Sequence, residues 1–221
     1  MDWTAFSLSL KLAAATCVLI FPIAIAAARA LAWGRFKGKS LVEAALMLPL
    51  VLPPTVLGYY MLVGFAPSSA LGRVAILVTG HPLAFTFAGI MLASLIVNLP
   101  FAIAPMQRAF ESIPVAVREA AWVSGLSPLA TFARIELPLS WPGIVSAMAL
   151  VFAHTLGEFG VVLMIGGNIP GETRTLSIAV YDAVQSMRQA DAGLMAAALL
   201  GFSFLAILIV QLSAKRSRSR P

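Results

Sequence analysis

His154 and Glu158 are the two residues whose types and spacing come closest to a reactive site. Four positions apart, they would share one face of a helix, where an imidazole and a carboxylate can pair or bind a metal ion. Two ligands without a third do not make a metal site. The surrounding apolar stretch offers no paired carboxylates, second histidine or serine–lysine arrangement, so an enzyme embedded there is the weaker alternative.

Nucleotide and thiol chemistry are not predicted either. A P-loop of the type Gly-x-x-x-x-Gly-Lys-Ser/Thr does not occur in the sequence. Cys17 is the single cysteine and lies in an apolar run, which excludes an internal disulfide and a thiolate metal cluster. We therefore expect a chain that hydrolyses nothing, holds no metal or cofactor, and buries Cys17 as a small apolar side chain.

The composition places these residues in a membrane. The 221 residues are 60% hydrophobic and 11% charged, whereas soluble domains carry about 25% charged residues. The net charge is +6, but the basic residues form no stripe with interleaved aromatics, so no nucleic-acid partner is expected. The sequence predicts one all-α, polytopic membrane domain over residues 1–221.

Stretches free of acidic and basic residues predict the membrane spans, because about 20 apolar residues cross the hydrocarbon core as a helix. Five candidates cover residues 12–28 (extendable past Lys11), 44–72, 82–107, 139–157 (extendable to about 165) and 192–214. A loop is expected near 66–69. Residues 166–189 begin as a turn and continue as a helix too polar to span. This predicts an outer loop with an interfacial or pore-packing helix or, as an alternative, a re-entrant sixth element.

The basic residues predict the orientation. Five spans divide the loops into two sets, and one set holds 11 of the 15 lysines and arginines. Cytoplasmic loops are enriched in these residues, so we expect the N-terminus outside and the basic tail at 215–221 inside, in contact with lipid. A cleaved signal peptide is the alternative for the first span, but its basic cluster follows the apolar stretch instead of preceding it.

The cytoplasmic segment 108–138 has the pattern of two helices and a turn. Pro114 begins a helix that runs to Val123, and Gly125 stops it. Ser127 and Pro128 then suit the N-cap and first position of a second helix, which runs toward Ile135. Leu137 and Pro138 are expected to end this short helix before the next span.

This segment resembles the signature loop of the membrane subunits of binding-protein-dependent ABC importers. The resemblance rests on seven residues with the full spacing of that loop: Glu119, Ala120, Ala121, Gly125, Ile135, Leu137 and Pro138. In that family the loop forms coupling helices that insert into a groove of an ATPase subunit. Two alanines would then give a flat packing face, and Glu119 would pair with a basic partner. Glu43-Ala44-Ala45 lacks the downstream glycine and is interpreted as an ordinary helix start.

Three further stretches are similar to the molybdate permeases of this family. They are residues 48–60, 98–101, and 155–176, which includes Gly157-Glu158-Phe159-Gly160. Sulfate permeases share the last element, so sulfate remains an alternative. The short chain and the proline-rich second span favour molybdate or the chemically similar tungstate.

The second span contains Pro53 and Pro54, which remove backbone hydrogen bonds and predict a kink. Thr55 would lie at this kink, where exposed polar atoms can line a cavity. The kink is therefore a candidate part of the gate, and a kink needed only for helix packing is the alternative.

Three polar residues complete the candidate pathway. Asn98 is expected to bridge helices or to face the pore. Glu158 would repel a dianion, so we expect it to be protonated, to pair with Arg174 or another basic group, or to hydrogen-bond helix ends, either as a gate or as a structural tie. Arg174, outside, would draw in the anion or receive a binding protein, or else be a surface charge without such a role.

The resemblance implies a type I ABC importer permease fold in the bacterial inner membrane. It implies a homodimer with the pathway on the two-fold axis, two cytoplasmic ATPase subunits that use ATP and Mg²⁺, and a periplasmic molybdate-binding protein. An ATPase-independent transporter or channel is the other alternative, and the signature loop argues against it.

Overall fold

The computed structural model describes residues 1–218, and every regular element in this range is helical. The elements are α1 (Trp3–Trp33), α2 (Lys39–Val51), α3 (Pro54–Phe65), α4 (Ala70–Thr79), α5 (Phe87–Glu111), α6 (Val115–Val123), α7 (Pro128–Thr131), the π-helical segment η1 (Phe132–Glu136), α8 (Leu137–Gly157), α9 (Gly160–Gly166), α10 (Leu176–Gln185) and α11 (Gln189–Arg218). The tail predicted at 215–221 lies partly outside the described residues.

Among the described residues, four helical stretches are long and apolar enough to cross a membrane: Trp3–Trp33, Phe87–Glu111, Pro128–Gly157 and Gln189–Ile209. The bent pair α2 and α3 gives a fifth if it counts as one span. This agrees with the predicted all-α fold of about five spans. The predicted loop at 66–69 is present, and a helix, α10, forms within the polar segment 166–189 as predicted.

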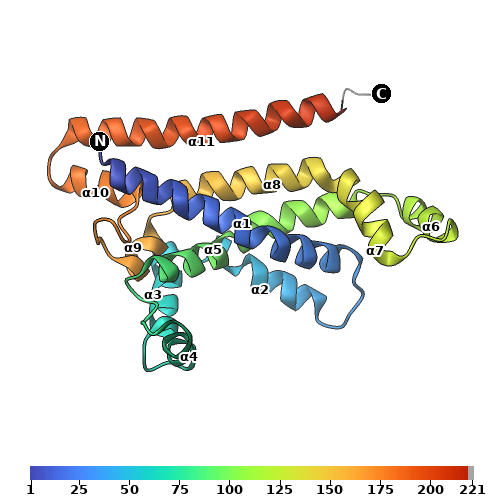
Figure 1. Ribbon diagram of the computed structural model, residues 1–221, viewed down its shortest axis with the longest axis horizontal. Helices are drawn as coiled ribbons and strands as arrows, with labels where there is room; N and C mark the ends of the chain where they lie inside the picture. The colour runs from blue at the N-terminus through green and yellow to red at the C-terminus, as the bar shows by residue number, and fades with distance from the viewer. Residues whose placement is uncertain (219–221) are drawn as a thin grey trace.

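The centre of the molecule is a bundle of α1, α5 and α8, with a core that includes Ile20, Ile103, Met106, Phe110 and Ile144. Figure 1 shows α11 running alongside this bundle, and α3 and α4 projecting from it. Only 11% of the apolar window of α11 is buried, as expected of a helix that faces lipid or another subunit.

The two ends of the bundle differ. In Figure 1, α6 and α7 lie at one end of the long axis, and α9, α10 and the N-terminus lie at the other. The signature loop is therefore separated from the polar segment 166–189 by the length of the long helices.

Two predicted spans are interrupted. The second predicted span bends at Pro53, where a kink was expected. The bend is a complete break, which leaves α2 and α3 as separate helices at 112°. The fourth does not continue past Glu158, because α8 ends at Gly157 and Glu158 is extended, with φ −63° and ψ 126°. Hydropathy alone could not separate a broken helix from a continuous one.

The prediction that Leu137 and Pro138 end the second loop helix is wrong. The chain passes from α7 through η1 into α8, and the Leu137 N–H bonds to the Phe132 carbonyl, five residues back. This wider turn accommodates Pro138, which lacks an N–H and whose ring would crowd the carbonyl four residues earlier in an α-helix.

Candidate functional site

The loop after α5 folds as its local sequence predicts. Helix α6 spans Val115–Val123, and Gly125 follows with φ +81°. Gly125 N–H donates to Trp122 O and Leu126 N–H to Ala121 O, both at 3.0 Å, which is a Schellman end. The Ser127 hydroxyl then accepts from Ala130 N–H and caps α7. The turn between α6 and α7 is therefore fixed by short-range hydrogen bonds.

The two alanines of the signature do not form one flat face. Ala120 is exposed beside the exposed Glu119, whereas Ala121 is 7% exposed and packs inward. Successive residues of a helix point about 100° apart, so adjacent alanines cannot share a face. Only Glu119 and Ala120 of this triplet are free to meet a partner.

Exposed apolar side chains surround this part of the loop. Val123 is 91% exposed and Leu129 is 76% exposed, and Val115 and Trp122 are also exposed. Clustered apolar side chains beside charged ones are typical of a protein interaction surface. Because the family resemblance predicts that a partner binds here, we call the four exposed residues Glu119, Ala120, Val123 and Leu129 the docking surface.

The last signature residues lie in the body of the protein. Ile135 belongs to η1 and is half-buried, and Leu137 packs against the core at the start of α8. Pro138 is exposed at the second position of α8. The seven residues are thus divided between an exposed helix and the base of a long apolar helix, and the structure does not gather them into one patch.

A charged cluster at this base was not predicted. Glu136 is fully buried, and its two carboxylate oxygens accept from Arg29 Nε at 2.6 Å and Arg118 Nε at 2.7 Å. The sequence carried one signal, an acidic residue next to an apolar run in a region rich in arginine. No local pattern indicates which arginines it meets, since Arg29 is 107 positions away.

The break between α2 and α3 lies next to the break between α8 and α9. A Cβ on Gly160 would lie 2.7 Å from Pro54 Cβ, and a Cβ on Gly58 would lie 2.7 Å from Met164 Cβ. Glycine is thus required where α9 approaches α3. A pocket of about 530 Å³ lies beside this contact, lined by Pro54, Thr55, Ala153, His154, Gly157, Glu158, Phe159 and Gly160.

Glu158 lies at this pocket and is 7% exposed. Its Oε1 accepts from Val161 N–H at 3.3 Å, its Oε2 lies 3.8 Å from His154 Nε2, and its carbonyl accepts from the Ser177 hydroxyl at 2.6 Å. Of the predicted alternatives, a hydrogen bond to a helix end and the approach of a basic side chain, that of His154, are both present, whereas Arg174 pairs with Asp2 and Asp182 instead.

Asn98 bridges two long helices, as one alternative predicted. It is fully buried in α5, and its Nδ2 donates to Thr155 Oγ1 of α8 at 3.1 Å and to Ser94 O at 2.8 Å. Its Oδ1 lies 3.2 Å from His154 Nδ1. A polar chain therefore runs from Asn98 through His154 to Glu158 and the pocket.

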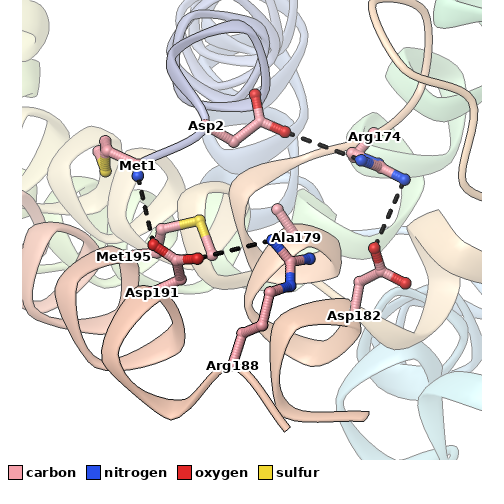
Figure 2. Close-up of a pocket in the computed structure, with 8 residues that line it drawn as sticks. All are labelled: Met1, Asp2, Arg174, Ala179, Asp182, Arg188, Asp191 and Met195. Carbon is pink, nitrogen blue, oxygen red and sulfur yellow. Dashed lines mark ion pairs between the residues drawn. The ribbon is translucent and has the colours of Figure 1, made fainter. Parts of the chain in front are cut away.

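Arg174 belongs to a separate charged cluster at the N-terminal end of the bundle. Figure 2 shows it between Asp2 and Asp182, with N···O distances of 3.9 and 3.5 Å. In the same cluster Asp191 lies 3.8 Å from the Met1 amino group and 3.6 Å from Arg188 Nη1. The cationic groups each have a carboxylate partner, so this cluster has little excess positive charge for an anion.

The geometry defines a class of protein. Long apolar helices around a bundle, a helical loop with an exposed docking surface at one end, and interrupted apolar helices beside a pocket are features of a membrane permease subunit. Residues 20–219 match the family described as binding-protein-dependent transport system inner membrane component, and the chain belongs to this family. The predicted family is thereby confirmed.

Two individual relatives are similar to this chain over most of its length. The chain is 43% identical over 218 residues to the molybdenum transport system permease protein ModB of Azotobacter vinelandii, covering 99% of this chain and 96% of the relative. It is 30% identical to a probable sulfate transport system permease protein of Chlorella vulgaris, over 80% of this chain and 66% of that relative.

A solved structure confirms the fold. A bacterial ABC transporter involved in the import of the acidic polysaccharide alginate contains a chain that superposes with a TM-score of 0.78 at 19% identity, covering 96% of this chain and 78% of that one. The predicted type I ABC importer permease fold is therefore correct.

Proposed function

We propose that this chain is the membrane-spanning subunit of an ATP-driven importer that carries molybdate into the cell. We infer the substrate from the 43% identity to a molybdenum permease over nearly the full length of both chains. Tungstate, a tetrahedral dianion of similar size, is the nearest alternative substrate. Sulfate is the next, because a sulfate permease is also among the relatives.

We propose that ATP is hydrolysed by two partner subunits that bind the docking surface. The exposed apolar side chains of Val123 and Leu129 beside Glu119 support this, because such a surface would be costly to leave in water. ATP and Mg²⁺ then belong to the partners, and this chain contributes no nucleotide chemistry.

We propose an inner-membrane orientation with α6 and α7 in the cytoplasm and the N-terminus outside. The support is the positive-inside rule, because Arg108, Arg118 and Arg134 lie in or beside the loop that contains α6 and α7. The opposite end, which holds the cluster of Arg174 and Arg188 with its carboxylates, would then receive a periplasmic molybdate-binding protein.

We propose that two copies of the chain form the pathway between them, with the paired helix breaks as its gate. Irregular backbone within a membrane is tolerated where it is buried in protein or lines a cavity, and the breaks at Pro53 and Glu158 border the 530 Å³ pocket. Thr55 and His154 contribute hydrogen-bonding groups to its lining. The described lining includes no lysine or arginine, which suits passage of a dianion without tight binding. Its acidic residue, Glu158, is only 7% exposed, and its Oε1 accepts from Val161 N–H.

Transport by the reconstituted complex tests these proposals. The permease, its ATPase and its binding protein are placed in proteoliposomes, and ATP-dependent uptake of molybdate, tungstate and sulfate is compared. Uptake of molybdate or tungstate well above sulfate is expected. A preference for sulfate would overturn the substrate, and uptake without the ATPase would overturn the coupling.

A further inference from the structure

The docking helix α6 is connected to the long helices through few side chains. Among the residues of α6, all of which the structure describes, only Ala121 is buried, and the side chain of Arg118 is 12% exposed. Arg118 immediately precedes the exposed Glu119. One residue of α6 therefore faces the proposed partner while its neighbour reaches into the body of the permease.

Arg118 contacts two other elements as well as its own helix. Its Nε lies 2.7 Å from Glu136 Oε1, in η1. Its guanidinium lies 4.0 Å from the ring of Trp33, the last residue of α1, and 5.0 Å from that of Trp122 in α6 itself. Stacking on two indoles and pairing with one carboxylate restrict the guanidinium to a single orientation.

Glu136 joins this arginine to a second one. Its other oxygen, Oε2, lies 2.6 Å from Arg29 Nε on α1, and the Arg29 guanidinium lies 5.1 Å from the Phe132 ring. The carboxylate is fully buried, whereas the Arg29 side chain is 33% exposed. A buried carboxylate is strongly destabilising when it loses its partners, so α1, α6 and η1 are held to one another at this point.

Glu136 also lies where the helix changes its hydrogen bonding. It is the last residue of the π-helical segment, and its carbonyl accepts from the Ser140 hydroxyl at 2.8 Å, inside α8. A displacement of α6 that moves the carboxylate would therefore act directly on the start of α8, the helix that ends at the pocket beside Glu158.

We propose that Glu136 is a positioning residue that couples the docking helix to transport, by tying α6 through Arg118 to α1 through Arg29 and to the base of α8. This inference rests on the proposed function, since it assigns a role within ATP-driven import. Glu136 itself touches neither anion nor nucleotide, and its action is to make α6, α1 and α8 move together.

The test is the number of anions imported per ATP hydrolysed by the reconstituted complex. Glu136→Gln keeps the size and one acceptor oxygen but removes the charge, and Glu111→Gln, at an exposed carboxylate at the end of α5, is the matched control. The complex that carries Glu136→Gln is expected to assemble and hydrolyse ATP while the ratio falls several-fold. The control is expected to keep the wild-type ratio.

Arg118→Gln provides a second variant if Glu136→Gln does not yield folded protein, because it leaves Glu136 paired with Arg29. It is expected to lower the ratio in the same way. An assembled complex of either variant with the wild-type ratio would overturn the inference. If the wild-type complex imports no anion in the presence of ATP, the proposed function fails, and the inference fails with it.

Discussion

Gly160 and Pro54 are in direct contact across the two helix breaks, so that a methyl group on Gly160 would lie 2.7 Å from Pro54 Cβ. Gly160→Ala is therefore expected to push α9 away from α3 and to destabilise the protein by about 1–3 kcal/mol, the usual cost of overpacking. Uptake should fall, because the proposed gate would no longer close. Thermal unfolding in detergent and uptake by proteoliposomes measure the two effects.

Gly64→Ala is the matched control for this variant. Gly64 lies in α3, and a Cβ there would meet no heavy atom within 4 Å. Its replacement should leave both stability and uptake close to wild type. Equal behaviour of the two variants would show that the close contact of the breaks has no role.

Gly125 is required for its backbone conformation and not for space. Its φ is +81°, and a Cβ would meet nothing within 4 Å. Gly125→Ala should destabilise the turn by about 1 kcal/mol, because the left-handed conformation is unfavourable for alanine. Weaker co-purification of the ATPase subunit is the expected readout.

Asparagine tolerates the left-handed region better than alanine, so Gly125→Asn should retain more of the ATPase than Gly125→Ala. If the two variants bind the ATPase equally weakly, the backbone conformation is not the reason that glycine is needed there.

A charge placed on the docking surface should prevent the permease from binding its ATPase subunit. Val123→Asp places a charge on a side chain that is 91% exposed, so the isolated permease should remain as stable as wild type. Co-purification of the ATPase should be lost, because the charge would be buried unpaired in the interface. Ser112→Asp, at an exposed position before α6, is the control, and full assembly by Val123→Asp would contradict the assignment of the surface.

Asn98 should contribute to stability through its link to α8. Asn98→Ala removes the bond to Thr155, and interhelical hydrogen bonds in membranes are worth about 0.6 kcal/mol on average and up to about 1.7 kcal/mol. A double-mutant cycle with Thr155→Val, read by unfolding in detergent, should return a coupling energy in this range.

Ser94 provides the comparison one turn away on α5. Its buried hydroxyl has no hydrogen-bond partner in the described structure, so Ser94→Ala should be neutral or slightly stabilising. If Ser94→Ala costs as much as Asn98→Ala, the bridge to Thr155 is not what stabilises this region.

Features that depend on composition and on near neighbours were predictable from the order of the residues. Long apolar runs predicted the spans, since hydrophobicity is additive along a helix. Pro114, Gly125 and Ser127 predicted the limits of α6 and the start of α7, because helix ends are set by hydrogen bonds and backbone angles within a few residues. The family followed from spacing within the same loop.

Contacts between distant residues became apparent only from the packing of the helices. Glu136 binds Arg29, 107 positions away, and Asn98 binds Thr155, 57 positions away. Glu158 was expected to have Arg174 as one possible partner, yet its side chain accepts from Val161 N–H in the first turn of α9 and lies near His154. The reason is physical: these contacts depend on how α1, α5, α8 and α9 pack against one another. A pattern within one helix specifies which face is buried but not which helix covers it.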